Sequence, residues 1–121
     1  MNNTTTKIID REKFRDSFKY YDSYVVVEVM DLFLNDYAAN LEELQKWIHR
    51  FDFNMLNHSA HSLKGVVAYF STELSELCYK LELKGSENDG NGLQTIYDQL
   101  KEGILLMVEE IHELRAEYSA M

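Results

Sequence analysis

The chain has 121 residues and carries 12 Lys and Arg against 21 Asp and Glu, so its formal net charge of −9 disfavours nucleic acids and anionic membrane surfaces as partners. This length predicts one domain that is large enough for a core of its own, and the absence of proline with only five glycines favours an all-α fold. The single cysteine, Cys78, excludes an internal disulfide and favours a reducing compartment.

The N-terminal region predicts a flexible tail and then a short helix. Residues 1–8 are mostly polar, without an apolar signal region, and no run in the chain approaches the roughly 20 apolar residues of a membrane span. We therefore expect a cytoplasmic protein whose single domain covers residues 9–121. Asp10 is a plausible N-cap, and Phe14 is placed to contact Ile9 as a hydrophobic staple. We expect this helix to run for about three turns, as its apolar spacing suggests, and to cover one end of the fold.

Four longer segments predict amphipathic helices, because their apolar residues recur every three or four positions. The first is capped by Asp22 or Ser23, and the second is capped by Asp52. The apolar stripe of the first comprises Val26, Met30, Phe33, Tyr37, Leu41, Leu44 and Ile48, and that of the second comprises Leu56, Ala60, Leu63, Val67 and Phe70.

The remaining two helices are separated by one evident loop. Ser71 or Thr72 begins the third long helix, and Gly85 is expected to stop it. Residues 86–92 form the loop, and the last helix follows, with an end at 116–121 that is expected to fray. Short connections between amphipathic helices predict an antiparallel up-down-up-down four-helix bundle with a short additional N-terminal helix.

The second long helix carries a candidate reactive site made of His61, Lys64 and Gly65. The apolar stripe places His61 about 140° from its centre, so the imidazole is expected to point to solvent. Lys64 brings a cation within reach of the ring, and Gly65 leaves a gap beside it. A glycine inside a helix costs about 1 kcal/mol relative to alanine, which favours a role in partner access. An imidazole nitrogen is a nucleophile near neutral pH, and a nearby cation suits a phosphoryl group.

The run Ala60-His61-Ser62-Leu63-Lys64-Gly65 resembles the signature of the histidine-containing phosphotransfer (HPt) domains, which reads Ala-His-x-Leu-Lys-Gly in a helix of an antiparallel bundle. Every fixed position matches. The resemblance continues through Leu77-Cys78-Tyr79-Lys80-Leu81-Glu82, which is similar to the family's next helix, and it covers about residues 27–111.

This resemblance implies a phosphorelay intermediate of a two-component system. The phosphoprotein would accept a phosphoryl group on the imidazole nitrogen far from Cβ of His61 and pass it on, with Lys64 neutralising the phosphoryl charge. Donor and acceptor would be aspartates of receiver domains in response regulators or hybrid histidine kinases, which supply Mg²⁺, so no cofactor is expected on this chain. The glycines form no phosphate-cradling motif, so we expect a phosphocarrier and not a kinase.

The resemblance also implies neighbours for the imidazole. The family often has Gln or Glu on the adjacent helix, where the side chain hydrogen-bonds the ring and orients it. Glu82 follows the matching pattern, although its spacing from His61 is one residue shorter than usual and Ser71 stands where Gly is common. The expected contacts around the ring are Asn57, His58, Lys64, Gly65 and Ala68.

Two other functions remain open from the residues alone. One is a non-catalytic helical adaptor that has the HPt scaffold and uses another surface. The other is a metal site in a helical bundle, formed by His58, His61 and Glu82, since His58 and His61 share a helix face. The metal site is disfavoured because Lys64 would repel a cation and no second Glu-x-x-His motif occurs, so we expect no metal.

Overall fold

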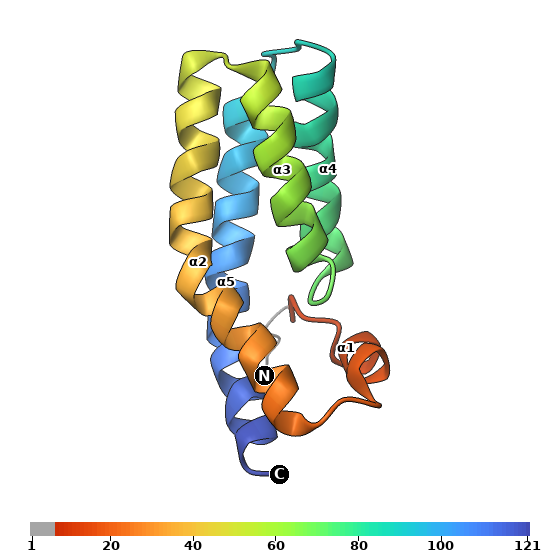
Figure 1. Ribbon diagram of the computed structural model, residues 1–121. Coiled ribbons are helices and arrows are strands. Elements are labelled where there is room, and N and C mark those ends of the chain that lie inside the picture. The colour runs from red at the N-terminus through yellow and green to blue at the C-terminus, as the bar shows by residue number, and fades with distance from the viewer. Residues whose placement is uncertain (1–6) are drawn as a thin grey trace, which may run out of the picture.

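The computed structural model describes residues 7–121 as five helices, with no strand in that range. Four of them pack so that each contacts two neighbours in the cyclic order α2, α3, α4, α5. Figure 1 shows α2 and α5 running the length of the molecule, α3 and α4 alongside their upper part, and α1 beside the lower part. The predicted four-helix bundle with an added N-terminal helix is confirmed. The helices are α1 (Arg11–Phe18), α2 (Ser23–Arg50), α3 (Phe53–Val67), α4 (Thr72–Ser86) and α5 (Leu93–Ser119).

Three of the predicted N-caps accept a hydrogen bond from the backbone N–H three residues on. These distances are 3.1 Å for Asp10, 3.1 Å for Asp52 and 3.2 Å for Ser71. Asp22 is the N-cap of α2 without such a side-chain bond. Each bonded cap satisfies a backbone donor that the first helical turn leaves without an intrahelical partner. Local sequence therefore sets where α1, α3 and α4 begin.

The apolar stripes form the core, as their periodicity predicts. In α2 every stripe residue is buried except Tyr37, which is half-buried. The stripe residues of α3 are all buried, and so is Phe70, which follows the end of α3 at Val67. Cys78 of α4 is fully buried, and burial raises the pKa of its thiol to about 12, so it packs as a neutral apolar group. Within residues 7–121, no helix has the length and apolar character that crossing a membrane requires.

The prediction that Gly85 ends its helix is wrong, because α4 continues to Ser86. Gly85 is buried, and a Cβ there would lie 2.8 Å from both the backbone N of Asn57 and the backbone O of Phe53. The glycine therefore permits a close approach of α3 and α4, which is a packing role and not a termination signal. We call the contact of Asn57 with Gly85 and with the carbonyl of Glu82 the α3–α4 joint.

Helix α1 packs against the chain after α3 and against the end of α5. The ring of Phe14 stacks on Phe70 at 5.3 Å between centroids and meets Tyr118 edge-on at 5.9 Å. Tyr118 is buried, and α5 extends to Ser119, so the prediction that residues 116–121 fray is wrong over most of that range. The end of α5 is ordered by a tertiary aromatic contact that its own polar sequence does not reveal.

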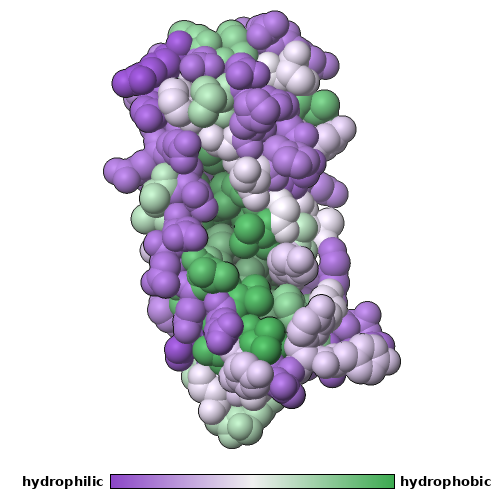
Figure 2. All heavy atoms as spheres, viewed as in Figure 1, coloured by the Kyte–Doolittle hydropathy of each residue, from purple (hydrophilic) through white to green (hydrophobic). Residues whose placement is uncertain are grey.

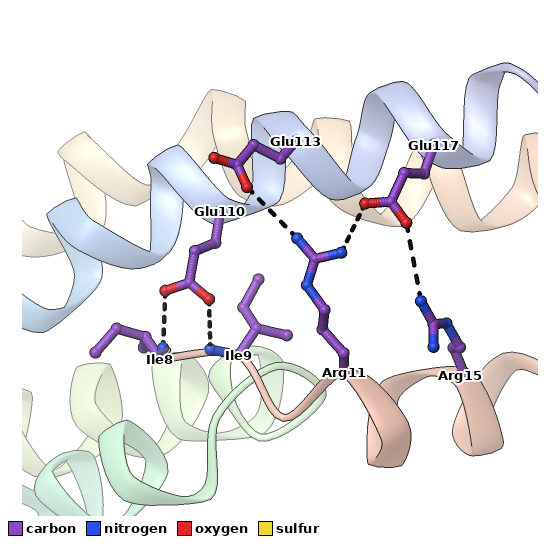
Figure 3. Close-up of polar contacts among 7 residues, drawn as sticks. All are labelled: Ile8, Ile9, Arg11, Arg15, Glu110, Glu113 and Glu117. Atoms are coloured by element: carbon purple, nitrogen blue, oxygen red, sulfur yellow. Dashed lines mark hydrogen bonds and ion pairs between the residues drawn. The ribbon is translucent and has the colours of Figure 1, made fainter. Parts of the chain in front are cut away.

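Polar contacts fasten the N-terminal segment along α5 (Figure 3). Glu110 accepts hydrogen bonds from the backbone N–H groups of Ile8, at 2.7 Å, and Ile9, at 3.0 Å. Arg11 pairs with Glu117 at 2.6 Å and with Glu113 at 3.6 Å. Ile8 packs against the core, and residues 1–6 of the predicted tail lie outside the described part of the chain, so the boundary at residue 8 stays a prediction.

We expect Glu110→Ala to lower the free energy of unfolding by about 1–3 kcal/mol, because two backbone donors lose a charged acceptor. Denaturant unfolding followed by circular dichroism measures this change. Exposed Glu109 is the neighbouring control, and Glu109→Ala should stay within about 0.5 kcal/mol of wild type. Equal stability of the two variants would contradict the role of Glu110.

Candidate functional site

His61 lies in the middle of α3 with its imidazole directed outward. Its helix neighbours Ala60 and Leu63 are buried, whereas 67% of the His61 side chain is exposed. The predicted orientation is confirmed. The rigid helix fixes the position of the backbone below the ring, and solvent or a partner can reach the ring itself.

Glu82 of α4 contacts one nitrogen of this ring. Its Oε2 lies 3.2 Å from Nδ1 of His61, and only 18% of the Glu82 side chain is exposed. A carboxylate can only accept here, so the contact favours the proton on Nδ1 and leaves the lone pair of a neutral ring on Nε2. The shorter spacing from His61 does not displace Glu82. Ser71 caps α4 in the short connection between the two helices, where its Oγ accepts a hydrogen bond from the backbone N–H of Leu74 at 3.2 Å.

Lys64 shares the same carboxylate. Its Nζ lies 2.7 Å from Oε1 of Glu82 and 4.8 Å from the ring centroid of Tyr79. Glu82 thus joins His61 through one oxygen and Lys64 through the other. Sequence reasoning missed Tyr79, although it precedes Glu82 by three residues and so lies on the same side of α4.

The charges around Glu82 decide its ionisation. Partial burial raises the pKa of Glu82, but contacts with Lys64 and then with His61 lower it by more than burial raises it. The net pKa therefore lies below the ordinary value of 4.5. The carboxylate is therefore ionised at neutral pH. His61 and Lys64 on α3 therefore both face a full negative charge on α4.

This lowered pKa predicts a pH-dependent stability. A carboxyl group whose pKa is lower in the folded state stabilises the fold above its unfolded pKa, and this contribution is lost as the pH falls through the folded pKa. We expect wild type to lose stability on acidification below pH 4.5 more steeply than Glu82→Gln, as measured by denaturant unfolding at a series of pH values. The control is Glu76→Gln at an exposed position of α4, which should keep the wild-type slope. Equal slopes for wild type and Glu82→Gln would contradict the prediction.

The remaining residues predicted around the ring occupy different places in the structure. A Cβ at Gly65 would meet nothing within 4 Å, so the space beside His61 is open. His58 is exposed and lines a groove between α2 and α3, and Ala68 is half-buried at the end of α3. Asn57 instead belongs to the α3–α4 joint, where its Nδ2 donates to the carbonyl O of Glu82 at 2.9 Å.

The described residues do not gather a metal site. Between residues 7 and 121, no group of three or more His, Cys, Asp or Glu side chains is arranged to hold an ion. His61 meets Glu82 on the α4 side of α3, while His58 lines the groove toward α2. The arrangement at His61 is an exposed nucleophile, a carboxylate behind it and an ammonium beside it.

Comparisons with known proteins agree with this geometry. The family model described as Hpt domain matches residues 28–119. The crystal structure of histidine-containing phosphotransfer protein B from Pseudomonas aeruginosa PAO1 is similar to the chain, with a TM-score of 0.82 and 20% sequence identity. The similarity covers 94% of this chain and 99% of that one. No match was found among curated proteins.

Proposed function

Since the chain belongs to the Hpt-domain family and acts in phosphorelay histidine phosphotransfer, we propose that Nε2 of His61 is the atom that carries the phosphoryl group. The observation that supports this choice is the contact of Nδ1 with Glu82, at 3.2 Å, on a ring that is otherwise exposed. The opposite nitrogen is then available to a docking protein. His58, His49 and His112 are also exposed, but within residues 7–121 no comparable contact with a carboxylate holds their rings.

The transfer that we propose is an in-line displacement. The Nε2 lone pair attacks the phosphorus of an aspartyl phosphate, the N–P bond forms, and the P–O bond to the aspartate breaks, so that the carboxylate leaves with the bonding electrons. The proton stays on Nδ1, and the ring becomes cationic. Glu82 lies against that positive charge and stabilises it, while Lys64 is within reach of the oxygens of the incoming group. The reverse displacement passes the group to a second aspartate.

The partners that we propose are receiver domains, which supply the aspartate and Mg²⁺. Figure 2 shows apolar side chains along the face between α2 and α3, with hydrophilic side chains on either side. Val66 of α3 is exposed and lines the groove of this face, as Asn40 of α2 does. Leu32 of α2 is 64% exposed and lies two helical turns before Asn40. Gly65 separates this face from His61 without adding a side chain. A receiver could therefore pack on apolar surface and still reach the imidazole.

We also propose a cytoplasmic location, where receiver domains and a reduced thiol would be found together. The free thiol of Cys78 is buried in the core and fits such a compartment.

The test is to incubate the protein with a radiolabelled phosphorylated receiver and Mg²⁺. We expect label on this chain that is lost in acid and stable in base, as a phosphorus–nitrogen bond requires, and that maps to the peptide containing His61. Absence of label from a panel of receivers would overturn the proposal and favour the non-catalytic adaptor.

A further inference from the structure

The ammonium of Lys64 is held by two groups that both come from α4. Glu82 contacts it at 2.7 Å, and the Tyr79 ring lies beneath it at 4.8 Å from the centroid. The two holders differ in kind, since one is an anion and the other an aromatic face. Only 25% of the Lys64 side chain is exposed, so this long side chain is confined next to His61.

Glu82 alone would not keep Lys64 in position for a contact with a phosphoryl group. Its ion pair with Lys64 already neutralises the ammonium, and Glu82 has a second contact with His61. When the imidazole of His61 gains a phosphoryl group, the phosphoryl oxygens compete with Glu82 for the ammonium of Lys64. The imidazole is then cationic and attracts the Glu82 carboxylate more strongly than before. Lys64 then needs a contact that keeps it close without another negative charge.

We propose, on the basis of the phosphotransfer function above, that Tyr79 is a positioning residue for Lys64. Its ring face attracts the ammonium through a cation–π interaction that persists while Lys64 exchanges Glu82 for the phosphoryl oxygens. The ring also limits the rotamers of a side chain that loses much entropy on ordering. Tyr79 is 47% exposed, so its contact with Lys64 explains the position of a large aromatic group that the core does not enclose.

The test compares Tyr79→Leu, which removes the aromatic face, with Tyr79→Phe, which keeps it. At saturating phosphorylated receiver, we expect the Leu variant to accept label about two- to fivefold more slowly than wild type, as the strength of an exposed cation–π contact predicts. The Phe variant should restore the rate. The receiver concentration for half-maximal rate should stay the same in both, because the ring acts on Lys64 and not on docking.

Coupling to Lys64 separates positioning from a direct contact with the receiver. In a Lys64→Met background, adding Tyr79→Leu should change the rate no further. The control is Tyr20→Leu, which removes a similar contact with Lys19, at 5.2 Å, on the connection between α1 and α2 and not on α3 or α4. This control should transfer as wild type does.

Three results would overturn the role of Tyr79. They are an unchanged rate in Tyr79→Leu, an equal loss in Tyr79→Phe, and a loss that persists in full without Lys64. Each presupposes a labelled wild-type protein, so failure of this inference is distinct from failure of the proposed function, in which wild type itself takes no label. Thermal unfolding of both Tyr79 variants shows whether the fold is retained, and the Phe variant keeps the test valid if the Leu variant is destabilised.

Discussion

His61→Gln should abolish phosphoryl transfer from a receiver and leave the fold intact. Glutamine keeps a polar side chain but has no ring nitrogen with a free lone pair, so no N–P bond can form. The site is exposed, and the contact with Glu82 is the main interaction that changes, so we expect the free energy of unfolding to shift by no more than about 0.5–1 kcal/mol. Loss of label with retained stability separates a chemical role from a structural one.

His58→Gln is the matched control, because His58 is an exposed histidine on the same helix, one turn away. This variant should accept label in the same acid-labile form, with at most a change in the receiver concentration required. Label that survives His61→Gln, or that disappears with His58→Gln instead, would assign the phosphoryl group to another residue.

Gly85→Ala should destabilise the protein by about 1–3 kcal/mol, although alanine is the better helix former by about 1 kcal/mol. The new methyl group would lie 2.8 Å from backbone atoms of Asn57 and Phe53, which cannot move aside as a flexible side chain can. Helices α3 and α4 must therefore separate at the α3–α4 joint. Because His61 and Glu82 lie on these two helices, we also expect slower phosphoryl transfer.

Gly65→Ala provides the opposite case within the same bundle. Nothing lies within 4 Å of a Cβ at this position, so the substitution should stabilise the protein by up to about 1 kcal/mol through helix propensity. Denaturant unfolding of the two variants measures both effects. If Gly85→Ala were as stable as Gly65→Ala, the close packing of α3 and α4 would not constrain this joint.

The two glycines also mark how far sequence reasoning reaches. Each is a poor helix former within a predicted helical segment. The signature around His61 correctly places Gly65 on the open face of a helix. Gly85 has the same local signal near the end of a predicted helix, and termination was the natural interpretation. Its real cause is a close approach by a segment about 30 residues earlier, which no local pattern encodes.

The contacts in the site also divide into those that the sequence predicts and those that depend on the packing of α3 and α4. Helical spacing brings His61, Lys64 and Gly65 together, because residues three and four positions apart are neighbours on a helix. Whether Glu82 reaches the ring depends on the length and cap of the connection at Ser71 and on the register of α4. The shared carboxylate and the position of Tyr79 under Lys64 follow from that register.

The amino-acid sequence by itself determined the helices, their buried faces, three bonded N-caps and an exposed nucleophile beside a cation, because each depends on periodicity or on groups within one turn. Only the tertiary structure decided the α3–α4 joint, the order of the α5 end against Phe14, and the pairing of both His61 and Lys64 with one carboxylate. These features depend on how far apart and in what register two helices pack. That register is set by the whole core and not by any single segment.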